Sequence, residues 1–247
     1  MDSDYVSLLV ELLSGQVPQG PGSPASTRRA LAAVGSLPPR PSVADIGCGR
    51  GASALVLARA TGGHVLALDR LPEMVAATRS RAEEAGLDVE AVVGDMAAPP
   101  IPPGTLDLLW SEGAAYSIGF AEALRAWRPL LREGGFIGVS ELCWRTSDVP
   151  ADAAAYWAEG YPGMVGADAC GAQLADARFT ELHRFFLPDS DWAAYYEPIA
   201  AALPTFREAH VGDAVAAQVA DEMEAEVAAW SRWGHLYGYL FLVGRAC

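Results

Sequence analysis

The sequence predicts an α/β protein with a doubly wound, mostly parallel sheet of seven strands, an antiparallel last strand and helical cap insertions. Three observations support this prediction. Short apolar runs alternate with helical stretches, closely spaced glycines follow the first of these runs, and a last apolar run follows a long helical stretch. At 247 residues, 51% of them hydrophobic, the chain can form one such domain with an added cap.

Residues 1–40 are predicted to be a helical leader, and residues 41–247 the main domain. Apolar residues at helical spacing predict a helix from Tyr5 to Leu13. The loop from Gln19 leads to a second helix, with Ser23 as its N-cap and Pro24 at its first position. We expect the leader to fold over a ligand site as a lid; the alternative is a plain linker.

Seven apolar runs predict the strands of the sheet. They are the run that begins at Val43, His64–Leu68, Val89–Val93, Leu106–Trp110, Phe136–Val139, Phe179–Leu187 and Tyr237–Gly244. The helices predicted in the second half are Pro150–Tyr161, Asp168–Ala177, Trp192–Leu203 and Asp213–Trp233. Segments around residues 145–177 and 188–233 therefore form the predicted cap, and the last two strands form a hairpin-like pair with the final strand antiparallel.

The glycine-rich turn after the first strand, residues 45–51, reads DIGCGRG. Glycines without Cβ atoms let backbone amides at a helix start approach a ligand. With the spacing G-x-G-x-x-G/A, Gly47, Gly49 and Ala52 fit a dinucleotide site, and Asp69 lies where a ribose-binding acid is expected. With the spacing D-x-G-x-G-x-G, the turn resembles the first motif of class I S-adenosylmethionine-dependent methyltransferases.

Acidic residues also stand at the ends of the second and third strands. Asp69 ends the second strand, where a carboxylate can accept hydrogen bonds from both ribose hydroxyls of an adenosine. A helix cap is the other role open to it. Gly94, Asp95 and Met96 follow the third strand, at the same carboxyl edge, where open α/β sheets bind ligands.

The resemblance to class I S-adenosylmethionine-dependent methyltransferases extends over nearly the whole chain. It is most specific at the fourth strand, where residues 110–120 read WSEGAAYSIGF, a segment similar to one in a group of small bacterial methyltransferases. The resemblance implies S-adenosylmethionine as cofactor, S-adenosylhomocysteine as product and methyl transfer as reaction. The cofactor-binding residues that it implies are Asp45, Gly47, Cys48, Gly49, Asp69, Arg70, Asp95, Met96 and Ser111.

Methyl transfer from a sulfonium depends mainly on alignment and exclusion of water, and needs a base only for an acceptor that must lose a proton. Glu112 and Glu141, after the fourth and fifth strands, are the candidate bases, and Tyr116 could orient the acceptor. Glu112 could instead hydrogen-bond within its own loop, and Glu141 could be structural. Tyr116, Trp144, Trp157 and Tyr161 are the predicted substrate-binding residues, in a region where most aromatic residues form core.

Composition narrows the possible partners. A formal net charge of −14 argues against nucleic acid or an anionic membrane. The four scattered cysteines form no metal-ligand spacing, so no metal is expected. The N-terminal residues lack a signal-peptide pattern and no apolar run reaches spanning length, so we expect a cytoplasmic protein, monomeric or homodimeric.

The leading hypothesis is therefore a methyltransferase for a small-molecule acceptor. A protein that binds S-adenosylmethionine without catalysis is the alternative, because no single residue is indispensable for this chemistry. A nicotinamide-dependent oxidoreductase is supported only by the second glycine spacing.

Overall fold

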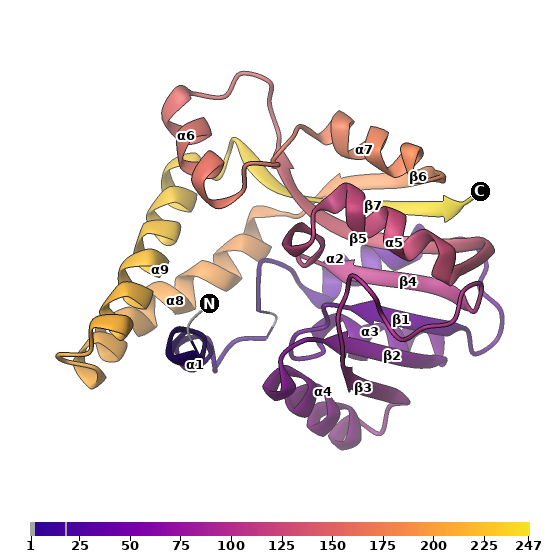
Figure 1. Cartoon of the computed structure of the whole chain (residues 1–247), viewed down its shortest axis with the longest axis horizontal. Coiled ribbons are helices and arrows are strands. Elements are labelled where there is room, and N and C mark those ends of the chain that lie inside the picture. Colours follow the sequence, from indigo (N-terminus) through magenta and orange to yellow (C-terminus); the bar gives the residue numbers. More distant parts are fainter. Residues whose placement is uncertain (1–2, 18) are drawn as a thin grey trace.

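The computed structural model describes residues 3–17 and 19–247, so residues 1, 2 and 18 of the predicted leader lie outside it. One seven-stranded sheet has the order β3-β2-β1-β4-β5-β7-β6 (Figure 1). The strands are β1 (Ser42–Ile46), β2 (His64–Asp69), β3 (Val89–Val93), β4 (Leu106–Glu112), β5 (Leu131–Trp144), β6 (Phe179–Phe186) and β7 (Tyr237–Ala246). Strands β1 to β5 pair in parallel, and β7 is antiparallel to both β5 and β6. The predicted fold class is confirmed.

Helices cover both faces of the sheet (Figure 1). The first half contains α1 (Ser3–Leu12), α2 (Pro24–Ala32), α3 (Ala52–Thr61), α4 (Pro72–Ala85) and α5 (Phe120–Trp127). The second half contains α6 (Ala151–Gly160), α7 (Ala167–Asp176), α8 (Asp189–Ala209) and α9 (Ala214–Trp233), and short 3-10 turns η1 (Ala115–Ser117) and η2 (Arg128–Leu130) flank α5. Helices α2 and α3 pack in one core layer with Trp110, whereas α5 and α7 pack in the other with Ile137.

Local signals in the sequence account for several helix ends. The Ser23 hydroxyl accepts a hydrogen bond from the Ser26 amide at the start of α2, with Pro24 as the first helical residue, as predicted. Asp213 caps α9 in the same way, and Gly86 ends α4 with φ of +62°.

Two predicted elements are longer in the structure. Strand β5 begins at Leu131 rather than Phe136, so Gly134, with φ of +70°, lies inside it. Helix α8 runs to Ala209 rather than to Leu203, and passes through Pro198 and Pro204. The buried face formed by Ile199, Leu203 and Phe206 offsets the loss of backbone hydrogen bonds at the prolines.

Helices α8 and α9 form an arm beyond one end of the sheet, with α1 and α6 beside it (Figure 1). The core under this arm is rich in aromatic residues, among them Trp192, Tyr196 and Tyr237. The leader divides: α1 packs on α8 and α9, whereas α2 packs on α3 and β7. Within the described ranges, no helix combines the length and apolarity needed to cross a bilayer.

Candidate functional site

The glycine turn between β1 and α3 is anchored to the neighbouring strand. The amides of Gly47 and Cys48 both donate to the carbonyl of Leu68, at 2.8 and 3.0 Å. Gly47, Gly49 and Gly51 have φ values of +77°, +52° and +77°. A Cβ on Gly47 would lie 2.4 Å from the Cβ of Ala114, so glycine is required for close packing of the turn against the loop after β4.

Asp69, at the end of β2, holds the same turn from the side. Its carboxylate accepts hydrogen bonds from the Gly49 amide at 2.9 Å and the Leu71 amide at 3.0 Å. The side chain is half-buried, and the neighbouring Arg70 is exposed. The helix-cap role and the role at the turn are therefore combined in one carboxylate, whose oxygens still have free lone pairs for a ligand.

Asp45 and Ser111 are polar side chains buried at the ends of adjacent strands, β1 and β4. Asp45 accepts a hydrogen bond from Ser53 at 2.6 Å, whereas its Oδ1 and the Ser111 hydroxyl have no partner among residues 3–17 and 19–247. Burial raises the pKa of Asp45 to about 7. Two unpaired polar atoms at one edge are what a polar ligand would satisfy.

The segment after β3 lies over the glycine turn. A Cβ on Gly47 would be 3.2 Å from the methyl carbon of Met96, and Met96 is half-buried. Asp95 is exposed, and its Oδ1 accepts the Ala97 amide at 2.9 Å. The Trp127 indole fixes this segment by donating to the Met96 carbonyl at 2.8 Å.

Glu112, at the end of β4, is held by side chains rather than by its own loop. Thr27 of α2 and Trp110 both donate to its Oε1, at 2.8 and 2.7 Å. Burial raises the pKa of Glu112 to about 7, while these two hydrogen bonds oppose the shift. Both donors use one oxygen, so Oε2 is left for another group. Sequence reasoning missed Thr27, because nothing near it marks an interaction 85 residues away.

Glu141 lies on the other face of the sheet edge. It is 1% exposed and accepts the Tyr161 hydroxyl at 2.5 Å. Burial raises its pKa to about 7. The Tyr161 ring meets Tyr116 edge to face, with centroids 6.1 Å apart. Three predicted residues, Glu141, Tyr161 and Tyr116, are thus brought together.

Trp144 and Trp157, also predicted to bind substrate, pack around Tyr237. Their ring centroids lie 6.5 and 4.8 Å from that of Tyr237. Trp144 pairs with Tyr237 and Glu141 pairs with Leu240, so alternation along β5 puts Trp144 and Glu141 on opposite faces. Glu141 and Trp144 therefore face away from each other, although Trp144, Trp157 and Tyr161 all pack against the aromatic core under the arm.

The leader reaches the glycine turn through Gln19. A Cβ on Gly49 would lie 3.7 Å from the Gln19 side chain. The Gln19 amide donates to the carbonyls of Gln16 and Leu13, at 2.7 and 3.3 Å. This part of the leader is therefore folded on itself where it meets the turn.

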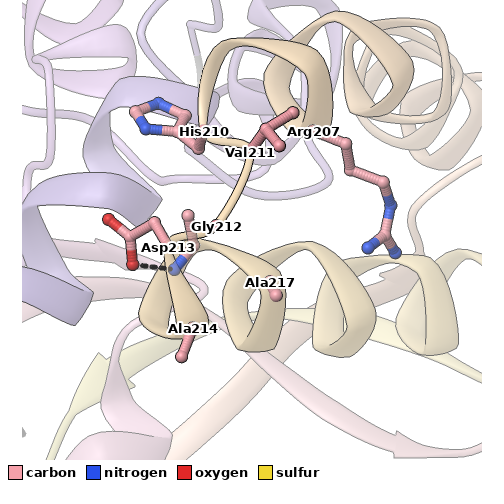
Figure 2. A pocket seen from close by; sticks show the side chains of 8 residues that line it. Arg207, His210, Val211, Gly212, Asp213, Ala214 and Ala217 are labelled. Atoms are coloured by element: carbon pink, nitrogen blue, oxygen red, sulfur yellow. Dashed lines mark hydrogen bonds between the residues drawn. The ribbon is translucent and has the colours of Figure 1, made fainter.

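Two surface hollows lie away from these residues. One, of about 370 Å³, is at the turn between α8 and α9, lined by Arg207, His210 and Val211 among others (Figure 2). The second, of about 480 Å³, lies between α1 and α8. Neither hollow includes a predicted site residue. The described part of the chain also holds no cluster of three or more side chains suited to a metal ion.

The known proteins that this chain resembles include several methyltransferases. The model of a methyltransferase domain matches residues 43–135. Nocamycin O-methyltransferase from Saccharothrix syringae is 38% identical over 135 residues, which are 52% of this chain and 46% of that protein. The chain thus spans about half the length of this curated relative. It covers 30% of another, phosphoethanolamine N-methyltransferase 1 of Arabidopsis thaliana.

Solved structures match over almost the full chain. A SAM-dependent methyltransferase from Geobacter sulfurreducens, in complex with S-adenosyl-L-homocysteine, has a TM-score of 0.84 at 20% identity, covering 98% of both chains. The cyclase SpnF has a TM-score of 0.76 at 22% identity, covering 98% of this chain and 93% of its own. At these identities the likeness establishes the fold. Residues 43–135 therefore match the model of a methyltransferase domain, in a chain whose fold is like that of solved methyltransferases over almost its full length.

Proposed function

We propose that this chain is an S-adenosylmethionine-dependent methyltransferase that acts on a small molecule. The observation that supports this most directly is the set of polar groups around the glycine turn. Asp69 ends β2, Asp95 follows the end of β3 by two residues, and the buried Oδ1 of Asp45 and hydroxyl of Ser111 lack partners in the described structure. These groups suit a ligand with a ribose, an amino group and a purine amine.

Each group has a role in this proposal. Asp69 holds the ribose hydroxyls, and Asp95 the adenine amine, with Met96 packed on the ring. Asp45 and Ser111 hold the methionine part. The remaining proposed contacts come from the turn and its neighbour, namely Gly47, Cys48, Gly49 and Arg70.

The bound cofactor supplies a methyl group on a sulfonium, already activated by its positive charge. The chain then has to align the acceptor and exclude water, which contributes about 7 to 11 kcal/mol as effective molarity. Glu112 Oε2 and Glu141 are the carboxylates that can take a proton from the acceptor, because burial raises the pKa of each to about 7, near neutral pH. Tyr116 orients the acceptor from η1.

The leader acts as a cover in this proposal. Gln19 lies against Gly49, and Thr27 holds Glu112, so the leader touches both the cofactor turn and a proposed base. Opening of this cover would admit the cofactor, and its closure would exclude water.

A small-molecule acceptor agrees with the named relatives, whose names specify O-methylation of nocamycin and N-methylation of phosphoethanolamine. A second candidate is cofactor binding without methyl transfer, because a protein named as a cyclase has the same fold.

Calorimetry of cofactor binding tests the proposal. We expect S-adenosylhomocysteine to bind more tightly than NAD. Asp69→Ala should weaken that binding about tenfold or more, because a hydrogen bond to a charged group contributes about 1.5 to 3 kcal/mol. Asp88→Ala, which removes an exposed partner of His64, is the matched control and should bind normally. Equal or tighter binding of NAD would remove the assignment, and unchanged affinity of Asp69→Ala would remove the role of Asp69.

A further inference from the structure

Polar groups from five elements act on one another beside the end of β4, although Tyr239, which pairs with Leu142, leaves its strand on the face opposite Glu141. The elements are η1, β5, β7, α8 and α9, and the groups are Tyr116, Glu141, Tyr239, Tyr195 and Glu226, here called the tyrosine cluster. Only Tyr116 and Glu141 were among the residues predicted from sequence. Glu226 is half-buried on α9, in the arm that projects beyond the sheet (Figure 1).

Ring contacts connect this cluster to the proposed methyl-transfer site. A Cβ on Gly113 would lie 3.4 Å from the Tyr239 hydroxyl, so Tyr239 adjoins the loop after Glu112. The Tyr239 ring stacks on Trp192, with centroids 5.4 Å apart and an interplanar angle of 22°. Trp192 in turn stacks on Tyr196 at 6.0 Å.

The same chain of contacts ends at Glu226. The Tyr196 hydroxyl donates to Glu226 at 2.7 Å. The ring of Tyr195 lies 5.0 Å from that of Tyr196. A carboxylate and several aromatic faces therefore lie within one continuous group of contacts that begins at Gly113.

Electrostatic coupling supports this proximity. Burial, and after it the charge of Glu226, raises the pKa of both Tyr116 and Tyr195. Burial also raises the pKa of Tyr239, and the charges of Glu141 and Glu226 add to it. One carboxylate on α9 thus acts on tyrosines from three other elements.

Within the described residues, Glu141 and Glu226 accept hydrogen bonds from tyrosine hydroxyls and form no ion pair, although the charge of Arg70 acts on Tyr116 and opposes the rise in its pKa. Neither the Tyr195 nor the Tyr239 hydroxyl makes a hydrogen bond within residues 3–17 and 19–247, although Tyr195 is only 9% exposed. The nearby Arg145 donates to the carbonyls of Tyr237 and Leu187 instead. Two carboxylates among aromatic rings disfavour an anion and favour a cation, which gains about 0.5 to 2 kcal/mol over a ring face.

We propose that the tyrosine cluster binds a positively charged nitrogen of the methyl acceptor, with Glu226 as the residue that selects for this charge. The inference rests on the proposed function, since it names the acceptor class for that site: a compound that carries an ammonium group. Glu226 pairs with the charge, and the rings of Tyr116, Tyr195 and Tyr239 surround it. The charge of Glu226, and that of Glu141 when it is ionised, disfavours an anionic acceptor.

The test compares choline with 3,3-dimethyl-1-butanol, which has the same shape without the charge. Calorimetry is done on the full chain, with and without S-adenosylhomocysteine. We expect choline to bind about tenfold more tightly than the neutral alcohol. Glu226→Gln should abolish this preference while its affinity for S-adenosylhomocysteine stays within about twofold of the native value.

Glu222→Gln is the matched control. Glu222 lies one turn earlier on α9 and accepts the hydroxyl of Tyr5, as Glu226 accepts that of Tyr196, but it is exposed. This variant should keep the preference for choline. Equal affinity for the two probes, no binding of either, or a preference that survives Glu226→Gln would overturn the ammonium site. Failure of S-adenosylhomocysteine to bind would count against the proposed function alone, because the two probes are also compared without it.

Discussion

The two halves of the chain build their parts of the site by different means. In residues 43–135, polar side chains stand at the ends of neighbouring strands and bond to nearby backbone, as Asp69 does to Gly49 and Leu71. In residues 136–247, the site groups are aromatic rings and carboxylates contributed by β5, β7, α8 and α9. The methyltransferase model covers only the first half.

In terms of the proposed function, this difference separates a rigid cofactor side from an acceptor side that depends on ring packing. Strand register and backbone hydrogen bonds leave little freedom at the turn around Gly47. Ring packing around Tyr237 depends on side-chain shape, which tolerates more substitution provided that total volume is kept. We therefore expect changes in the first half to affect cofactor binding and stability, and changes in the second half to affect the choice of acceptor.

Among single substitutions, Gly47→Ala should destabilise the chain most. The new Cβ would meet Ala114 at 2.4 Å, at a φ of +77°. Overpacking and the left-handed backbone together should lower the free energy of unfolding by about 2 to 5 kcal/mol. Urea denaturation measures this loss, and calorimetry should show weaker binding of S-adenosylhomocysteine.

Gly62→Ala is the control for the strain of a left-handed backbone alone. Gly62 has a φ of +63°, and a Cβ there would meet nothing within 4 Å. Its cost should be about 1 to 2 kcal/mol, with normal cofactor binding. Equal losses in the two variants would show that the close packing of the turn contributes nothing.

The next largest effect is the pH dependence that Glu141 imposes. Burial raises its folded-state pKa to about 7, above the ordinary value of 4.5, so the folded chain keeps a proton that the unfolded chain releases. Its contribution is complete below about pH 4.5 and is lost as the pH rises through 7, by about 3 kcal/mol. Glu141→Gln should remove this decline.

Denaturation at several pH values between 4.5 and 7 measures the difference between native chain and variant. Glu133→Gln, at an exposed position of β5, is the control and should follow the native curve. If the free energy of unfolding of Glu141→Gln fell with pH in parallel with that of the native chain, Glu141 would not be the cause of the decline.

A smaller effect is expected at the junction of the leader and the sheet. Thr27→Val removes the hydroxyl that donates to Glu112 at 2.8 Å, and should lower the free energy of unfolding by about 1 to 2 kcal/mol. It should also raise the pKa of Glu112 further, because a bond to its charged form is lost. Thr27→Ser keeps the hydroxyl and should behave as the native chain in the same urea titrations; a loss as large as that of the valine variant would point to lost packing.

The site residues that could be predicted from the sequence lie mostly in the first of these two halves. The glycine turn and the strand ends at Asp69 and Asp95 could be located because period-two and helical patterns fix where strands end. Glu226, Tyr195 and Thr27 could not, because their partners lie far along the chain and their neighbours are ordinary helical sequence. Helix α8 is also longer than its sequence predicts, because the burial of Phe206 offsets the helix-breaking effect of Pro204.

The place of β7 has a consequence for how the molecule is made. This strand joins β5 to β6, so β6 has no sheet partner before residues 237–246 are available. Residues 237–246 must therefore leave the ribosome before the aromatic half can assemble, while the five parallel strands β1 to β5 can already pair. The proposed cofactor side would then fold first, and the proposed acceptor side would pack onto it afterwards.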